Sequence, residues 1–318
     1  MPRVRAERAW AAAAGDKPPP YANVPAGESP PRCTDPTPGG AAIGAAERTA
    51  RGAGRLAFAR VDGASALVTC RATSPLQILA PRRRGPSAWA VLATHGGGLV
   101  EGDRLDLEVD VAAGAAAVLS TQAETKIYRS AGGRSSRQRL SARVGQGGVL
   151  AVVPEPVSPF AGARYEQEQR FELAPSASLL LVDALVAGRT ARGERWAFER
   201  YRSQNEVRVD GALALGDALL LAPRRPGELA RRLDPFQAFA LIVAVGPAFA
   251  GCATALCSAV EALPCAVGAP LLATVSPVAG GVLARCAATT TEALGAFVRA
   301  AVAPAASALG DDAFARRW

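Results

Sequence analysis

The feature that most constrains the fold is a strand–turn–strand unit that recurs from about residue 55. In each unit a strand of alternating polar and apolar residues leads through a short turn into a more apolar strand, which is the pattern of a β-hairpin. The turns of the last four units centre near residues 114, 147, 176 and 211, about thirty residues apart. The five units are LAFARV-DGAS-ALVTCRA, RLDLEVDV-AAGA-AAVLST, RQRLSARV-GQGG-VLAVVP, QRFEL-APSA-SLLLVDAL and NEVRV-DGA-LALGDALLL.

The spacing of these units predicts how they assemble. A single unit cannot bury its apolar face alone, so units repeated at this period are expected to stack on one another. We therefore predict a mainly β protein with a stacked or helical, β-solenoid-like sheet body. An ordinary β-sandwich, which uses similar patterning at shorter spacing, is the alternative.

The pattern changes after residue 226. FALIVAV predicts a buried strand, and PAFAGCATALCSAVEAL predicts an Ala-rich helix with Pro247 in its first turn. TTTEALGAFVRAAVAPAASAL predicts a second helix, with Thr290 or Thr291 as its N-cap. We expect about two helices in the C-terminal third, within a helical subregion at about 247–310.

The N-terminal segment has a different composition. KPPPYANVPAGESPPRCTDPTPGG has neither strand nor helix periodicity, so residues 1–54 are predicted to be a disordered extension and residues 55–318 a β domain. The start, MPRVRAERAWAAAAG, has an apolar run that is too short for a secretory signal. We expect a cytoplasmic location, with organelle targeting by this tail as the alternative.

The net charge and the apolar segments bear on the partners. The formal charge of +8 suggests a nucleic-acid partner, but basic residues cluster only in PRRRG at 81–85 and PRRPG at 223–227, without aromatic residues to stack bases. We expect no nucleic-acid partner. The stretch from Asp234 to Glu261 lacks charges and is long enough to cross a bilayer, but a Gly-Pro pair interrupts it. We expect no membrane span.

The glycine-rich segment at 96–104 resembles a phosphate-binding loop in its glycine spacing. Gly97 and Gly102 have the required spacing, but Asp103 follows where a lysine is needed, and the segment leads into a strand rather than a helix. We expect this chain to bind no nucleotide. The single histidine, His95, also rules out a His-rich zinc site.

Two carboxylates stand in apolar strands, Asp183 in SLLLVDALVAG and Asp217 in LALGDALLLAP. A buried carboxylate costs several kcal/mol, roughly, unless it is paired or bound to a cation. One interpretation is a salt bridge to an arginine such as Arg189 or Arg192. A second is a pair of acids in a β-solenoid enzyme that acts on polysaccharides. A third is a metal ligand.

Two further segments carry mixed polar and aromatic residues. TQAETKIYRS at 121–130 is interpreted as an exposed strand and loop. GRTARGERWAFERY at 188–201 is interpreted as a surface patch or the rim of a pocket. Neither segment indicates a chemistry by its spacing alone.

Several motifs, in one order, resemble the urease accessory protein UreD (UreH) family over about residues 55–318. The motifs are SPLQILAP at 74–81, GGGLVEGDRL at 96–105, STQAETKIYRS at 120–130, FAGARYEQEQRFEL at 160–173, VDALVAGRTARGERWAFERY at 182–201, DGALALGDALLL at 210–221 and SPVAGGVLAR at 276–285.

This resemblance implies a non-enzymatic function. A UreD-like chain is expected to dock on apo-urease with UreF and UreG and to help nickel reach the urease active site, along a path lined by carboxylates. The positions that match the family motifs are Asp103, Asp183 and Asp217, which become the candidate nickel-transit residues. The polysaccharide-acting enzyme remains the alternative, and an interaction-only scaffold with salt-bridged acids is a third hypothesis.

Overall fold

A computed structural model describes residues 51–81 and 85–314. The predicted disordered extension therefore lies outside the described residues up to residue 50. Residues 51–54, which the sequence assigned to that extension, belong to the first strand, β1 (Arg51–Val61).

The first of two sheets has seven strands in the order β15-β14-β12-β9-β6-β1-β2. Its five central strands run parallel, from β1 to β14, and the two edge strands pair antiparallel to their neighbours. The strands after β1 are β2 (Ala64–Ala72), β6 (Arg104–Val111), β9 (Ser136–Val144), β12 (Arg164–Leu173), β14 (Arg200–Val209) and β15 (Ala212–Leu221).

The second sheet has eleven strands, eight of them in the order β17-β18-β16-β13-β10-β7-β4-β3. The short strands β5, β8 and β11 extend it beside β13. Its strands are β3 (Leu76–Leu79), β4 (Ala88–Thr94), β5 (Gly98–Leu99), β7 (Ala116–Thr121), β8 (Thr125–Ile127), β10 (Val149–Val152), β11 (Val157–Pro159), β13 (Ser178–Val186), β16 (Ala238–Val245), β17 (Leu271–Val278) and β18 (Gly281–Ala288).

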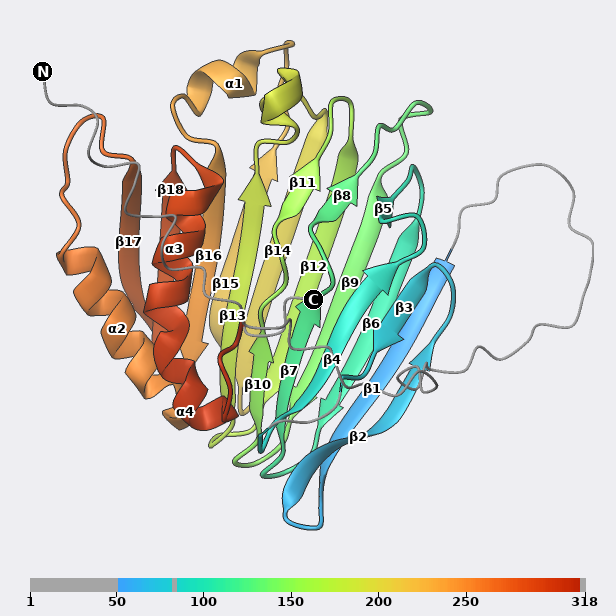
Figure 1. The fold of residues 1–318 in the computed structure, drawn as a ribbon, viewed down its shortest axis with the longest axis vertical. Coiled ribbons are helices and arrows are strands. Elements are labelled where there is room, and N and C mark those ends of the chain that lie inside the picture. The colour runs from blue at the N-terminus through green and yellow to red at the C-terminus, as the bar shows by residue number, and fades with distance from the viewer. Residues whose placement is uncertain (1–50, 82–84, 315–318) are drawn as a thin grey trace, which may run out of the picture. The chain divides into compact units, whose positions relative to one another are not determined.

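The chain winds between the two sheets, which confirms the β-solenoid-like body. It passes from β6 to β7, from β9 to β10 and from β12 to β13, changing sheet each time, and successive turns of the coil stack as parallel strands (Figure 1). The turns near residues 114, 147 and 176 are therefore corners between sheets. The prediction that these three units are hairpins is wrong.

The first and last units are true antiparallel hairpins, and their turns explain the difference. Both turns are Asp-Gly pairs with positive φ at each residue: 49° and 79° at Asp62 and Gly63, and 51° and 75° at Asp210 and Gly211. Positive φ at both central residues is the type I′ geometry that matches the twist of a two-stranded hairpin. The corner turns lack an Asp-Gly pair, so nothing in them forces the chain back onto the same sheet.

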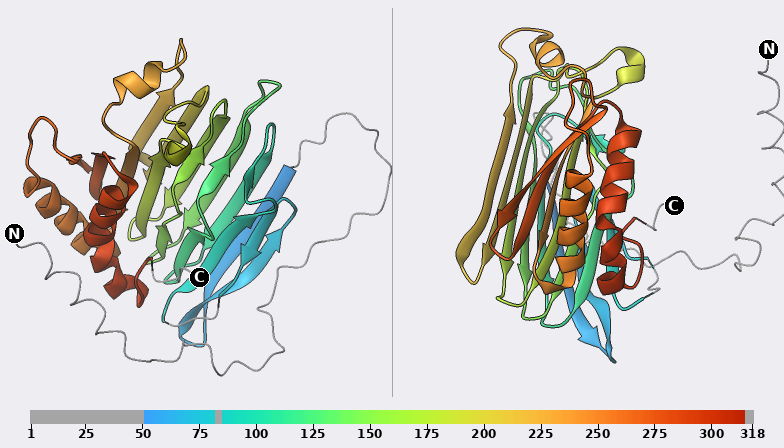
Figure 2. Two further views of the ribbon diagram at one scale, coloured as in Figure 1. Left: turned by 45° about the horizontal axis from the view of Figure 1, so that its top comes forward. Right: turned by 90° about the vertical axis from the view of Figure 1, so that its left-hand side faces the viewer.

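The fold has three layers. The two sheets lie face to face, and helices cover the outer face of the eleven-stranded sheet (Figure 2). One apolar core fills the space between the sheets, and a second lies between the eleven-stranded sheet and the helices. The α-helices are α1 (Glu228–Arg232), α2 (Ala250–Glu261), α3 (Thr291–Val302) and α4 (Ala306–Leu309), and the 3₁₀ helices are η1 (Thr190–Arg192), η2 (Pro247–Phe249) and η3 (Ala303–Ala305).

The two expected C-terminal helices are confirmed as α2 and α3. Thr290 is the N-cap of α3, because its side-chain oxygen accepts a hydrogen bond from the backbone N–H of Ala293 at 3.1 Å. The uncharged stretch from Asp234 to Glu261 divides into β16, η2 and α2. Among the described residues, the helical run Thr291–Leu309 is long and apolar enough to cross a membrane by length and composition, a test that core helices of soluble proteins also pass.

Candidate carboxylate site between the sheets

Asp183 occupies an inward-facing position of β13. Side chains alternate along a strand, and those of Leu181 and Leu185, two residues before and after Asp183, pack in the core between the sheets. Val182 and Ala184 face the helix layer instead. The pleat of β13 therefore directs this carboxylate into the core between the two sheets.

The Asp183 carboxylate is held by the opposite sheet. It accepts hydrogen bonds from Gln167 Nε2 at 3.0 Å, Ser203 Oγ at 2.8 Å and Asn205 Nδ2 at 3.0 Å. These donors satisfy the oxygens, but all three are neutral. The salt bridge that the sequence suggested for Asp183 is not formed, because Arg189 pairs with Glu194 and no ion pair within the described residues includes Asp183.

The registers of the two sheets bring this polar cluster together. In the eleven-stranded sheet Asp183 pairs with Leu241, which pairs with Arg285. In the seven-stranded sheet Asn205 lies directly opposite Asp217. The two rows face each other across the core, so Asn205 bonds to Asp183 and Arg285 reaches Asp217.

Asp217 forms the salt bridge that Asp183 lacks. Arg285 Nη2 lies 2.6 Å from Asp217 Oδ1, and this pair links the two sheets near their β15 and β17 edges. The Asp217 side chain is 12% exposed, whereas that of Arg285 is 53% exposed. The salt-bridge interpretation therefore holds for Asp217, with Arg285 as the partner in place of Arg189 or Arg192.

Two cavities have Asp183 as a lining residue. The larger, of about 230 Å³, is lined by Asp183, Asp217 and Arg285 together with apolar side chains such as Leu241. The smaller, of about 40 Å³, is lined by Asp183, by other polar residues such as Gln167 and Glu155, and by apolar side chains. Among residues 51–81 and 85–314, Asp183 alone lines both of these cavities.

Two buried tyrosines have pKa values that are raised in part by the negative charge of Asp183. Burial raises the pKa of Tyr165 and Tyr201 well above that of an exposed tyrosine, and the charge of Asp183 raises each pKa further. The hydroxyl of Tyr165 donates to Gln167 Oε1 at 3.1 Å. Both tyrosines therefore stay neutral, and Tyr165 extends the hydrogen-bond network around the carboxylate.

Asp103 lies in a separate environment. Its side chain is 5% exposed, and Oδ2 accepts a hydrogen bond from the backbone N–H of Val100 at 2.9 Å. The backbone N–H of Asp103 donates back to the Val100 carbonyl at 3.1 Å, which closes the turn before β6. Asp103 lines neither cavity at Asp183, so the structure does not bring it together with the other two acids.

Comparison with known proteins identifies the family. The model of the family described as UreD urease accessory protein matches residues 50–318. The chain belongs to the UreD family. A UreD from Anaeromyxobacter sp. (strain Fw109-5) is 56% identical over 83% of this chain and 89% of the relative, and one from Sorangium cellulosum (strain So ce56) is 49% identical over 84% of each. Urease accessory protein D of Arabidopsis thaliana is 38% identical over 61% of this chain and 67% of the relative.

Family membership confirms the resemblance seen in the sequence motifs and gives this chain an accessory role in urease maturation. Within residues 51–81 and 85–314, no three His, Cys, Asp or Glu side chains lie close enough together to hold a metal ion.

The sequence did not single out Gln167, Ser203 and Asn205, the partners of Asp183. Their strands, RYEQEQRFEL and RYRSQNEVRV, carry polar residues on both faces, so alternation alone does not show which face is buried. A signal was present in β12, because Gln167 shares its parity with Phe171, which is buried. That parity places Gln167 in the core of this UreD family member.

Proposed function

We propose that this chain is a non-catalytic scaffold that docks on apo-urease with UreF and UreG in the cytoplasm and conveys nickel through the core between its sheets. Membership of the UreD family supports the role in urease maturation. The observation that carries the nickel path is the position of Asp183. It is a half-buried carboxylate that lines two cavities, and only neutral donors hold it.

The donor atoms around Asp183 suit transit better than storage. The atoms that could bind a metal ion there are the oxygens of carboxylate, amide and hydroxyl groups. Oxygen ligands of this kind hold nickel more weakly than imidazole or thiolate ligands do. A path that conducts ions must bind them enough to admit them and weakly enough to release them. A single carboxylate with neutral neighbours meets both requirements, because its charge attracts the cation and no cage of ligands retains it.

Asp217 and Arg285 would act at one end of the path. The guanidinium of Arg285 competes with a cation for Asp217 and must move aside before nickel can bind there. Because the Arg285 side chain is half-exposed, it has room to move. The transit role of Asp103 stays a prediction, since its carboxylate closes a turn and lines neither cavity.

A polysaccharide-acting enzyme is the alternative function, with Asp183 and Asp217 as the acid pair. The cavity that both residues line has a volume of about 230 Å³, below the ~300–1,000 Å³ range of sites for drug-sized ligands. A polysaccharide needs a longer groove than this. Incubation of the pure protein with a panel of polysaccharides, followed by a reducing-sugar assay, would detect this activity, and sugar release abolished by Asp183→Asn would favour it over the nickel path.

The proposal is tested with the assembled complex. We expect UreF, UreG and apo-urease to co-purify with this chain, and with its Asp183→Asn and Asp217→Asn variants. Calorimetric titration of the complexes with nickel should show weak binding to the wild-type complex. The nickel affinity should be lower for the complex whose chain carries both Asp183→Asn and Asp217→Asn. Equal nickel binding by the two complexes would favour an interaction-only scaffold, and loss of co-purification from the wild-type chain would refute the docking role.

A further inference from the structure

A cavity of about 820 Å³ forms an open groove that does not include Asp183. Three sequence segments that the nickel path does not use meet there: TQAETKIYRS, GRTARGERWAFERY and PRRPG. The second segment was interpreted as a surface patch or pocket rim, and its residues do line this groove. The groove shares no lining residue with the two cavities at Asp183.

The groove has an excess of positive charge. Its two carboxylates are each paired: Glu194 with Arg189, and Glu199 with Arg164, whose Nε lies 2.7 Å from Glu199 Oε2. Three more arginines line the groove, and among the described residues their guanidinium groups form no hydrogen bond or ion pair. These are Arg129, Arg224 and Arg225, which leave three positive charges uncompensated.

The floor of the groove is aromatic and tightly packed. Trp196 and Phe198 are each 1% exposed, and their rings meet edge to face. Phe160 contacts Tyr128 edge to face, and the guanidinium of Arg189 lies 4.2 Å from the centre of its ring. Because Trp196, Phe198 and Phe160 are covered, the partly exposed ring of Tyr128 is the aromatic surface that an apolar side chain can contact.

The loop that carries Arg224 and Arg225 is fixed in its backbone. Pro223 and Pro226 flank the pair, and Glu228 Oε2 accepts hydrogen bonds from the backbone N–H groups of Arg224 at 2.8 Å and Arg225 at 3.3 Å. These bonds hold the pKa of Glu228 below its usual range, so its carboxylate stays charged and keeps both hydrogen bonds at neutral pH. The main chain is preorganised while both guanidinium groups remain free, which lowers the entropic cost of binding a partner.

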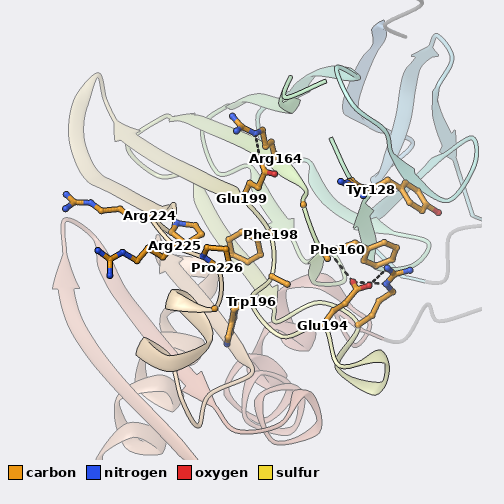
Figure 3. Close-up of a pocket in the computed structure, with 17 residues that line it drawn as sticks. Tyr128, Phe160, Arg164, Glu194, Trp196, Phe198, Glu199, Arg224, Arg225 and Pro226 are labelled. Atoms are coloured by element: carbon orange, nitrogen blue, oxygen red, sulfur yellow. Dashed lines mark hydrogen bonds and ion pairs between the residues drawn. The ribbon is translucent and has the colours of Figure 1, made fainter. Parts of the chain in front are cut away.

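The arginines are spread along the groove. Arg224 and Arg225 lie on the opposite side of it from Tyr128 and Phe160, with Phe198 and Glu199 between them (Figure 3). Arg129 follows Tyr128 in the chain, pairs with Ala163 in an isolated β-bridge and also lines the groove. Guanidinium groups at separate ends of an open groove fit several charges along an extended chain. They do not converge on one point, as a single phosphate would require.

We infer that this groove docks an acidic peptide segment of a protein partner, with its carboxylates against Arg129, Arg224 and Arg225 and an apolar side chain against the partly exposed ring of Tyr128. A single-stranded nucleic acid would also carry several negative charges, but its bases need exposed aromatic faces for stacking. Trp196, Phe198 and Phe160 are buried, and among the described lining residues Tyr128 alone offers a partly exposed ring, which is too little to stack successive bases. The inference concerns a surface separate from Asp183, so it stands or falls independently of the nickel path.

The test is fluorescence anisotropy with a labelled peptide in which pairs of glutamates alternate with single leucine or phenylalanine residues. We expect it to bind the wild-type protein, with an affinity that decreases as salt is added. The triple variant Arg129→Gln, Arg224→Gln, Arg225→Gln should bind it roughly tenfold more weakly or worse. All three side chains are exposed, so the fold should survive.

Matched controls separate the outcomes. The triple variant Arg71→Gln, Arg104→Gln, Arg299→Gln removes the same charge from positions outside the groove and should bind like the wild type. A peptide with glutamine in place of glutamate should not bind. The inference is overturned if the acidic peptide fails to bind, if both triple variants weaken binding equally, or if a single-stranded oligonucleotide of equal charge binds the groove more tightly.

Discussion

Asn205 Nδ2 lies 3.0 Å from Asp183 Oδ2, and this hydrogen bond joins β14 of one sheet to β13 of the other across the core. Asp183 therefore links the two sheets. No basic side chain among the described residues forms an ion pair with its carboxylate. Asp217, in contrast, has Arg285 as a counter-ion. The two carboxylates, which look alike in the sequence, differ in this respect.

The turn closed by Asp103 predicts a difference between two substitutions. Asp103→Ala removes the acceptor of the Val100 N–H and should lower the free energy of unfolding by about 1 kcal/mol. Asp103→Asn keeps a carbonyl oxygen there and should cost less than about 0.5 kcal/mol. Urea denaturation measures both values. If the two variants were equally destabilised, the hydrogen bond to Val100 would not be the cause.

The Asp217–Arg285 pair predicts a measurable coupling between the two side chains. A double-mutant cycle with Asp217→Asn and Arg285→Gln should give about 0.5–1 kcal/mol, because the half-exposed guanidinium is screened by solvent. Thermal unfolding of the four proteins provides the values. A coupling of zero would show that the ion pair contributes nothing to stability in solution.

The packing around Gly98 in β5 leaves no space for a methyl group. A Cβ added there would lie 2.4 Å from the carbonyl oxygen of Lys126, so Gly98→Ala should lower the free energy of unfolding by about 2 kcal/mol. Gly216→Ala is the matched control, since its Cβ would meet no atom closer than 3.8 Å. Its unfolding free energy should stay within about 0.5 kcal/mol of the wild type. Equal effects of the two changes would contradict the close packing at Gly98.

Glu101 predicts part of the pH dependence of stability. Backbone N–H groups of Gly132 and Arg134 donate to its carboxylate and hold its pKa below the ordinary value of 4.5. Its stabilising contribution is therefore complete above the pKa of the unfolded chain and is lost as the pH falls below about 4.5, through the folded-state pKa.

Glu101→Gln tests this contribution. The variant should be less stable than the wild type at pH 7, and the difference in urea midpoint should shrink as the pH falls below 4.5, the ordinary pKa of the carboxyl group. Urea midpoints measured across this pH range give the comparison. A difference that stayed constant down to low pH would show that the charge of Glu101 is not involved.

The sequence predicted the stacked β body, the C-terminal helices and the family, but it did not predict how the chain turns at each corner. Alternation and turn residues look alike in a hairpin and in a corner. The Asp62–Gly63 and Asp210–Gly211 pairs do distinguish the two hairpins, because type I′ turns favour this dipeptide. The corner turns near 114, 147 and 176 lack it.

The candidate site was predictable only in part. An acid in an apolar strand marked Asp183 and Asp217, because burial of an unpaired charge is costly. Their partners depend on the registers of strands that are distant in sequence, such as β18 with Arg285, which a single sequence does not contain. The basic groove shows the same limit, since the segments that form it meet only in the folded chain.

The central claim is that the charge of Asp183 conveys nickel. The direct measurement is the rate at which apo-urease, in complex with UreF, UreG and this chain, gains activity after nickel is added. Asp183→Asn keeps the size of the side chain, so the complex should assemble normally, and the account predicts an activation rate at least roughly tenfold lower, equivalent to ~1.4 kcal/mol. Activation by an intact Asp183→Asn complex at the wild-type rate would contradict the account.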